Sequence, residues 1–401
     1  MRQVKLVNNC RSCNATLEKQ VFDIGELKIN AFTPEPNTDV GSAPLTLMHC
    51  DKCDLIQLSH TVREQELYEN YWYLSRLNKK IVDNLQSIVQ DVCCEVDVNQ
   101  GDLVLDIGAN DGTLLSFYNS DNVIRVGCDP AKNIHSELEK NCDLMIGDFF
   151  NKENWTNAVG KRKAKIITTV AMFYDLDDPN SFVSDIKDIL DNDGVWLCQL
   201  MTARPMLDSN DLGNVIHEHI EYYTYKSLVN LMERHELEIF DVRENDINGG
   251  SYQLFIRHKN SGSINYAENI TPEHINNWAK NIDKNRDDTM HFIRSERASG
   301  KRIYIMGAST KGNTIMQYYG LDGDTIDGAA EIHPDKIGKY LVGSNIPIVH
   351  EDEAKEKADY FLVFPFHFKE LFVNKIMADW IAGGGKLIFC TPKFEVVGQN
   401  E

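Results

Sequence analysis

Apolar runs of strand length alternate with helical stretches from about residue 86 to residue 260, and this alternation constrains the fold more than any other feature. Strands are expected at Leu103–Ile107, Val123–Cys128, Ile166–Val170, Gly194–Leu200 and Ser251–Arg257. Amphipathic helices are expected between some of them, at Asn84–Cys94, Ser181–Leu190 and Tyr225–His235. Such alternation is typical of an α/β fold with a doubly wound, mostly parallel sheet.

Different patterns flank this region and predict three domains: residues 1–85, 86–260 and 261–401. The first segment shows little helical periodicity before Val62–Tyr73, which indicates a small module of loops, short strands and a connecting helix. Polar residues 259–271 mark the second boundary, and Thr271 is expected to cap a long helix from Pro272 to about Ala298. A smaller Rossmann-like domain then follows, with strands expected at Arg302–Met306, Ile326–Glu331, Tyr360–Phe364 and Lys386–Cys390.

Charge and composition exclude several classes of function. The chain has 61 acidic and 41 basic residues, a formal charge of −20, and such a surface repels nucleic acid. No apolar run approaches the 18 to 20 residues that span a bilayer, and no apolar segment of a signal peptide follows the N-terminus. Ten mostly unclustered cysteines then favour a reducing compartment, so we expect a cytoplasmic protein, without membrane or nucleic-acid partners, that is a monomer or weak dimer.

Two Cys-x-x-Cys pairs of equal spacing lie near the N-terminus. They can place four thiolates tetrahedrally around Zn²⁺, while each knuckle turn directs backbone N–H groups at sulfur. Two disulfides or buried unligated thiols are less favoured by this double spacing. Because protein fills all four positions, the predicted zinc site is structural rather than catalytic, with the ligands Cys10, Cys13, Cys50 and Cys53.

A glycine turn follows the first expected strand in the sequence Val104-Leu-Asp-Ile-Gly-Ala-Asn-Asp-Gly112. The spacing differs from the G-x-G-x-x-G of dinucleotide folds, and an aspartate before the first glycine favours a cationic ligand. A second aspartate ends the next strand, where a carboxylate can accept both ribose hydroxyls, and a third follows at the adenine position. This register predicts S-adenosylmethionine (SAM), although another nucleotide cofactor fits the same fold, with contacts from Asp106, Gly108, Asn110, Gly112, Asp129, Pro130, Asp148 and Phe149.

A His-Glu-His segment follows the fourth expected strand of the same domain. In an extended conformation His217 and His219 would share one face, with Glu218 on the other. A general base oriented by a carboxylate suits an imidazole that titrates near neutral pH. Tyr222 or Tyr223 could then donate to an oxyanion. A catalytic metal pair and two surface histidines without a role remain the alternatives.

Further candidates for substrate contact lie outside this segment. Asn248 and Gly249 begin an Asn-Gly-Gly-Ser turn that could approach a substrate or simply form a hairpin. Tyr71 and Tyr73 belong to an aromatic cluster that could equally pack a domain seam. Lys311 lies in a Gly-x-x-x-x-Gly turn that is not a P-loop but could bind an anion, or be a structural turn.

Together these motifs resemble the nucleotide-sugar C-methyltransferases over nearly the whole chain. The resemblance rests on the Cys-x-x-Cys pairs, Tyr71–Ser75, Val104–Gly112, the His-Glu-His segment with its Glu-Tyr-Tyr-Thr, and Asn248–Ser251. It continues in Gly307–Asn313, in Glu331–Lys336 and on to Ile346–Val349. It implies a zinc module, a SAM domain and a C-terminal Rossmann-like domain that helps to hold a nucleotide-linked sugar.

The resemblance also implies a reaction. A proton leaves the carbon beside the keto group of a 4-keto-6-deoxy sugar, and the enolate attacks the SAM methyl group. His219 takes the position of the base in that family, and Glu218 that of the preceding glutamate. The chain departs from characterised sugar enzymes, which carry a Tyr at Ile216 and a His within Met172–Asp175, so Tyr174 or Tyr73 are candidates to supply the missing phenol. Methylation of oxygen or nitrogen, and a catalytically silent SAM- and zinc-binding assembly protein, are the competing interpretations.

Overall fold

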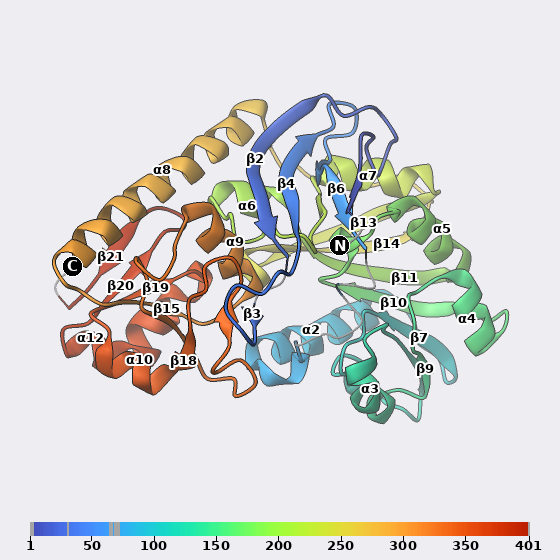
Figure 1. Cartoon of the computed structure of the whole chain (residues 1–401). Coiled ribbons are helices and arrows are strands. Elements are labelled where there is room, and N and C mark those ends of the chain that lie inside the picture. Colours follow the sequence, from blue (N-terminus) through green and yellow to red (C-terminus); the bar gives the residue numbers. More distant parts are fainter. Residues whose placement is uncertain (1–3, 30–31, 64–66, 68–72, 400–401) are drawn as a thin grey trace.

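A computed structural model describes residues 4–29, 32–63, 67 and 73–399 of the chain. Two open α/β sheets lie side by side, and an antiparallel N-terminal sheet stands over their junction (Figure 1). The expected α/β class with a central and a C-terminal Rossmann-like domain is confirmed. Among the described residues no helix is long and apolar enough to cross a membrane.

The central sheet has seven strands, all parallel except one. Their order is β13 (Leu237–Asn245), β14 (Ser251–His258), β11 (Leu190–Met201), β10 (Ala164–Val170), β7 (Asp102–Ile107), β8 (Val123–Cys128) and β9 (Leu144–Ile146), with β14 antiparallel. β7 pairs with β8 on one side and with β10 on the other, so the chain order reverses at β7. Ligands of open α/β sheets bind at such a reversal, beyond the carboxyl ends of the strands.

Alternate residues of these strands enter two different cores, as the two-residue repeat of a strand requires. Val104 packs with α2 (Lys79–Glu95), whereas Leu103 and Leu105 pack with α5 (Pro179–Ile189) and α7 (Tyr225–Arg234) on the opposite face. The predicted boundary after residue 85 is corrected here, because it cuts through α2. One continuous face of that helix, from Leu85 to Val92, is buried against the central sheet.

The N-terminal sheet draws one of its strands from the central domain. Its order is β12 (Glu221–Tyr222), β5 (Ile56–Leu58), β4 (Ser42–His49) and β2 (Lys19–Lys28), with every pairing antiparallel. β1 (Val4–Leu6) pairs separately with β6 (His60–Val62). Most of the helix that the periodicity suggested at Val62–Tyr73 lies outside the described residues. The segment after the His-Glu-His motif is thus tied to the first module by backbone hydrogen bonds.

The C-terminal sheet has six strands and again reverses at its first strand. The order is β18 (Ile348–His350), β16 (Gly328–Glu331), β15 (Ile303–Met306), β19 (Tyr360–Val363), β20 (Lys386–Phe389) and β21 (Glu395–Val397). All four strands expected here are present. The long helix is also confirmed as α8 (Pro272–Ala298), whose Thr271 cap accepts from the His274 N–H at 3.2 Å.

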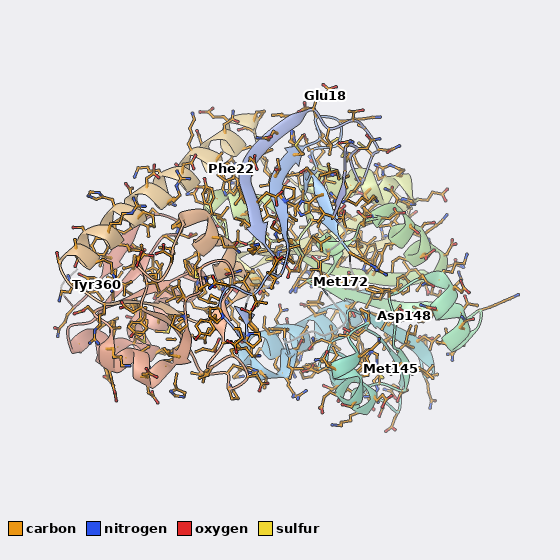
Figure 2. The ribbon with its side chains drawn as sticks, in the orientation of Figure 1. Glu18, Phe22, Met145, Asp148, Met172 and Tyr360 are labelled. Carbon is orange, nitrogen blue, oxygen red and sulfur yellow. The ribbon has the colours of Figure 1, made fainter. Side chains whose placement is uncertain are left out.

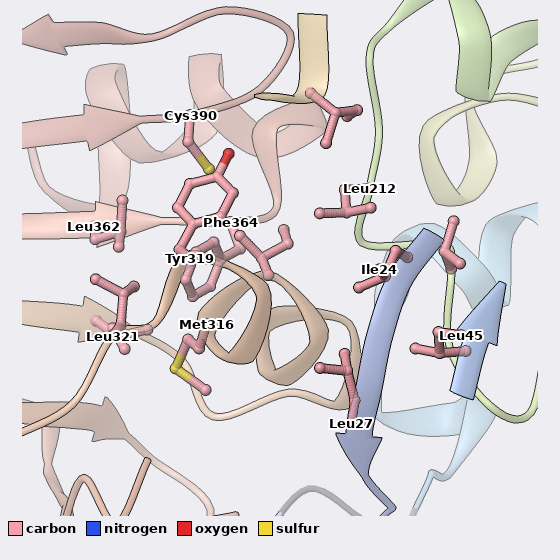
Figure 3. Packing of buried hydrophobic residues seen from close by; sticks show 14 of the residues in the cluster. Ile24, Leu27, Leu45, Leu212, Met316, Tyr319, Leu321, Leu362, Phe364 and Cys390 are labelled. Atoms are coloured by element: carbon pink, nitrogen blue, oxygen red, sulfur yellow. The ribbon is translucent and has the colours of Figure 1, made fainter. Parts of the chain in front are cut away.

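One apolar core joins the N-terminal sheet to the C-terminal domain. Phe22 lies on β2 (Figure 2). Its ring makes edge contacts with Trp278 of α8 and with Tyr318 of α9 (Thr310–Tyr319), at centroid separations of 5.4 and 5.7 Å. Ile24 and Leu27 of the same strand face α9 (Figure 3). This shared core fixes α9, and therefore its first turn, against the rest of the molecule.

Candidate active site

Four cysteine side chains converge at one end of the N-terminal module. Their sulfur atoms all lie within 4.8 Å of one another, and the Cys10–Cys53 and Cys13–Cys50 separations are both 3.5 Å. A tetrahedral zinc with Zn–S bonds of about 2.3 Å needs sulfurs about 3.8 Å apart. The Cys13 N–H also points at the Cys10 sulfur, at 3.5 Å. The donor set therefore fits one closed zinc site, as the spacing predicted.

Arg11, between the first two cysteines, connects this site to the strands that follow. Its buried guanidinium donates to the carbonyl oxygens of Leu58 and His60 at 2.7 and 2.8 Å. His60 in turn lies 3.1 Å from His217, measured between Nε2 and Nδ1, and the Leu58 N–H donates to the Ile220 carbonyl at 2.9 Å. The zinc knuckle is thus linked through Arg11 to the His-Glu-His segment, a link that spacing alone does not reveal.

The glycine turn after β7 holds the Asp129 carboxylate in a fixed orientation. Its Oδ2 accepts the Asn110 N–H at 2.8 Å and its Oδ1 accepts the Ala131 N–H at 2.9 Å. Gly108 has φ +72°, and a Cβ there would lie 3.1 Å from the Met172 side chain, so the turn requires glycine. The remaining lone pairs of Asp129 can accept ribose hydroxyls. Burial raises the Asp129 pKa above its usual range.

Asp106 lies buried at the end of β7. The Thr168 hydroxyl donates to its Oδ1 at 2.6 Å, and burial raises its pKa to about 7. A cationic ligand at this point would favour the ionised carboxylate, because opposite charges stabilise one another most where water is excluded. A sulfonium or ammonium group therefore suits this end of the site. This supports SAM over a pyrophosphate ligand.

These side chains line a cavity of about 630 Å³, large enough for a nucleoside cofactor and a second small molecule. Six of the eight predicted cofactor residues lie on its wall, namely Asp106, Gly108, Asn110, Asp129, Pro130 and Phe149. The other two do not. A Cβ at Gly112 would lie 2.7 Å from the Asn141 Cβ, so this glycine serves helix packing. Asp148 is exposed near β9 (Figure 2), where it accepts the Phe149 N–H.

His219 and Glu218 line the other part of the same cavity. The His219 Nδ1 lies 3.0 Å from the Asn214 carbonyl oxygen, which can only accept, so Nδ1 carries the proton and Nε2 keeps its lone pair. The Asn214 carbonyl therefore orients the ring. Burial, followed by the charge of Lys311, lowers the His219 pKa to about 3. The expectation of titration near pH 7 is corrected: the imidazole is neutral throughout the physiological range.

The segment forms turns instead of an extended strand, so the two histidines do not share a face. His217 faces His60 of the N-terminal module and does not line the main cavity. The Tyr222 hydroxyl donates to the His219 carbonyl at 2.8 Å, and the Tyr223 hydroxyl donates to Glu221 at 2.6 Å. Neither phenol lines the cavity, which corrects their predicted role as oxyanion donors.

Some of the residues predicted to contact the substrate line the cavity, and others do not. Four of them line the cavity: Tyr73, Tyr174, Asn248 and Lys311. Gly249 does not, and Tyr71 lies outside the described residues. Tyr174 makes an edge contact with the His219 ring at a centroid separation of 4.6 Å. Burial raises the Tyr73 pKa to about 12, so its phenol stays protonated and can donate.

Two polar residues of the cavity wall, Gln199 and His367, were not predicted from the sequence. Gln199, in β11, accepts from Gln253 and from Asn245 through its Oε1, at 2.9 Å each, so its amide is held in one orientation. His367 follows β19 of the C-terminal sheet, in the loop after a strand end. The rule that ligands bind beyond the carboxyl ends of parallel strands could have drawn attention to both.

The fold and the site together define a SAM-dependent class I methyltransferase with a structural zinc module. Three family models match successive parts of the chain: a zinc binding domain at residues 10–68, a methyltransferase domain at 73–242 and a C-methyltransferase C-terminal domain at 246–392. The chain is 24% identical to the C-methyltransferase NovU of Streptomyces niveus, over 99% of this chain and 98% of that protein. The chain thus contains a zinc-binding domain, a methyltransferase domain and a C-methyltransferase C-terminal domain in that order, and it is similar to a C-methyltransferase over its full length.

Similar solved structures include magnesium protoporphyrin IX methyltransferase from Synechocystis PCC 6803, with 9% identity and a TM-score of 0.34, over 45% of this chain and 79% of that one. The 1,6-didemethyltoxoflavin-N1-methyltransferase of Burkholderia thailandensis aligns with 11% identity and a TM-score of 0.35, over 45% and 78% of the two chains. The similarity to C-methyltransferases rests on the sequence matches alone.

Replacing Asp129 by Ala should weaken SAM binding by about 2 kcal/mol, the cost of losing hydrogen bonds to a charged group, or about 30-fold in Kd. Isothermal titration calorimetry measures the loss, with thermal unfolding to check that the glycine turn survives. Asp148→Ala is the matched control, because that carboxylate lies off the cavity wall. Unchanged affinity in the Asp129 variant would move the ribose site elsewhere.

Proposed function

We propose that the enzyme methylates the carbon beside the keto group of a nucleotide-linked 4-keto-6-deoxy sugar, through an enolate. The observation that supports this most is the position of His219 on the wall of the same cavity as Asp129, with its Nδ1 bound to the Asn214 carbonyl and its Nε2 left to accept a proton. A general base must share one space with the cofactor when the carbon it deprotonates is also the carbon that accepts the methyl group. The full-length similarity to a C-methyltransferase points in the same direction.

In this proposal His219 breaks the C–H bond. Its Nε2 takes the proton, and the electron pair of that bond moves into the carbonyl to form the enolate. Bound SAM supplies an electrophilic methyl group. A C–C bond then forms as the S–CH₃ bond breaks, so S-adenosylhomocysteine leaves and charge and atoms balance.

The other residues orient the groups and exclude water. The Asn214 carbonyl holds the His219 ring through Nδ1, so Nε2 cannot rotate away from the reacting carbon. Tyr222, by donating to the His219 carbonyl, braces the backbone of the same turn. The C-terminal domain closes the cavity with Lys311, His367 and Phe368. This position suits a C-terminal domain that helps to hold the sugar nucleotide.

We further propose that a small nucleotide-linked sugar is the partner, and that the enzyme acts in the cytoplasm as a monomer or weak dimer. None of the ten cysteines, all of which lie in the described residues, forms a disulfide, which suits a reducing compartment. The formal charge of −20 disfavours a nucleic-acid substrate, while a diphosphate needs only one or two local cations. Lys80 supplies such a cation on the cavity wall, whereas Lys311 lies beside the catalytic segment.

The test is proton exchange at the substrate carbon. The enzyme is incubated in D₂O with a panel of 4-keto nucleotide sugars and S-adenosylhomocysteine, which allows enolate formation but no transfer. We expect deuterium at the α-carbon of the true substrate and, when SAM replaces its product, a mass gain of one methyl group on that carbon. A methylated oxygen or nitrogen without exchange would instead establish the competing activity.

A further inference from the structure

An enolate needs a partner for its negative oxygen, and the two tyrosines of the His-Glu-His segment cannot provide one. Tyr222 and Tyr223 lie three and four residues after the base, but their hydroxyls donate to the His219 carbonyl and to the Glu221 carboxylate, away from the cavity. A group that stabilises developing charge must face the space where that charge appears. The donor must therefore come from another element.

Lys311 reaches the site from the C-terminal domain. It lies in the first turn of α9, and its Nζ donates to the Asn214 Oδ1 at 2.6 Å, with the Met201 sulfur at 3.6 Å. α9 packs tightly on the loop before the base, since a Cβ at Gly213 would lie 3.5 Å from the Lys311 Cβ. This lysine also lines the main cavity. Its ammonium is therefore held beside the catalytic segment.

One residue, Asn214, fixes the base and the ammonium relative to each other. Its main-chain oxygen accepts the His219 Nδ1 proton at 3.0 Å, while its side-chain oxygen accepts from Lys311. The Asn214 amide nitrogen donates to the Asp211 Oδ2 at 2.7 Å, so the amide cannot flip. Because one residue contacts both groups, the His219 ring and the Lys311 ammonium are held at a fixed distance from each other.

Burial lowers the Lys311 pKa, while the charge of the Asp211 carboxylate acts in the opposite direction and favours the ammonium form. Among the described residues no carboxylate lies within ion-pair distance of the Lys311 Nζ. Asp211 is the carboxylate whose charge acts on the Lys311 pKa. Its Oδ1 accepts the Gly213 N–H at 2.8 Å, and its Oδ2 accepts from the Asn214 amide. An ammonium in a partly dry cavity, with spare N–H groups and no counter-ion, is suited to an anionic oxygen.

We propose that Lys311 is a catalytic residue whose ammonium binds the enolate oxygen formed when His219 removes the proton. The C-terminal domain thus supplies the oxyanion partner of a base that the central domain carries. This inference rests on the proposed enolate reaction. Burial, followed by the charge of Lys311, lowers the His219 pKa, so the imidazole is neutral before it takes the proton.

Lys311→Met in the full-length zinc-loaded enzyme tests the assignment. Lys311→Arg retains the positive charge. Lys357→Met, in α10 (Glu351–Lys357) of the same domain, is the matched control. We expect kcat and the α-carbon exchange rate of the Met variant to fall about 10² to 10³-fold, as on removal of an oxyanion donor. SAM affinity and thermal stability should stay near wild type. The His219 pKa, followed by NMR, should rise, because a repelling charge is gone.

The outcomes separate this inference from the proposed function. The role of Lys311 alone would be overturned if His219→Asn abolishes deuterium exchange while Lys311→Met keeps an exchange rate within a few-fold of wild type. Wild-type enzyme that methylates its substrate without exchange would overturn the enolate reaction itself. A Met variant that loses SAM affinity and stability with an unchanged His219 pKa would show a structural lysine and also overturn the assignment. Partial recovery of exchange in Lys311→Arg would support it.

Discussion

His219→Asn should lower turnover by roughly 10² to 10⁴-fold, the usual contribution of a positioned general base, while SAM binds as tightly as before. A proton beside a ketone is too weakly acidic to leave unaided at neutral pH. The amide of asparagine fills similar space and can still donate to the Asn214 carbonyl, but it cannot accept a proton from carbon. The loss should therefore fall on the chemical step.

Two measurements check this result. Single-turnover methyl transfer gives the rate of the chemical step, and deuterium exchange with S-adenosylhomocysteine bound reports proton removal alone. Both should fall together in the Asn variant. His217→Asn is the matched control, since that ring faces His60 outside the main cavity. Near wild-type turnover in His219→Asn would remove this residue from the role of base.

Cys50→Ser should release the zinc and destabilise the N-terminal module. Structural zinc contributes an apparent binding free energy of about 10 to 16 kcal/mol in zinc-finger peptides, and a site with three thiolates keeps only part of this. Cys50 is buried, 3.5 Å from the Cys13 sulfur, so a hydroxyl there cannot restore the tetrahedral set. We expect one zinc per wild-type chain and a large loss of metal in the variant.

Metal analysis of protein purified without chelator gives the zinc content, and thermal unfolding with and without added zinc gives its effect on stability. Cys93→Ser is the control, because Cys93 is an exposed thiol on α2, far along the chain from the four ligands. It should keep its zinc. Wild-type protein without zinc, or a Cys50 variant that retains a full equivalent, would contradict the site.

Periodic apolar patterns were enough to predict most of the central sheet. Val123–Cys128 was predicted to the residue, because a buried parallel strand reads as a continuous apolar run. β13 was missed, since its outer half carries Asp, Arg and Glu that obscure the repeat. The zinc ligands and the position of Asp129 in the cavity could be predicted from short stretches of sequence, since each depends on a turn of a few residues.

The errors at the site have a different origin. Asp148 and Tyr222 were assigned from their positions in the chain, but their side chains bind their own neighbours instead, the Phe149 N–H and the His219 carbonyl. Tyr222 lies in β12 and pairs with Ile56 of β5, 166 residues earlier in the chain. Lys311 reaches Asn214 across 97 positions of sequence. Such long-range pairings set the site, so only the folded chain reveals them.

The pairing of β12 with β5 limits how freely this enzyme can exchange parts with its relatives. Strand pairing of this kind carries the register of one domain into another, since each residue of β12 has a set partner in β5. A chimera that replaced the first module alone would keep its metal ligands but present foreign partners to His217 and Ile220. Module and catalytic loop therefore form one unit of inheritance, and recombination or engineering that preserves activity must move them together.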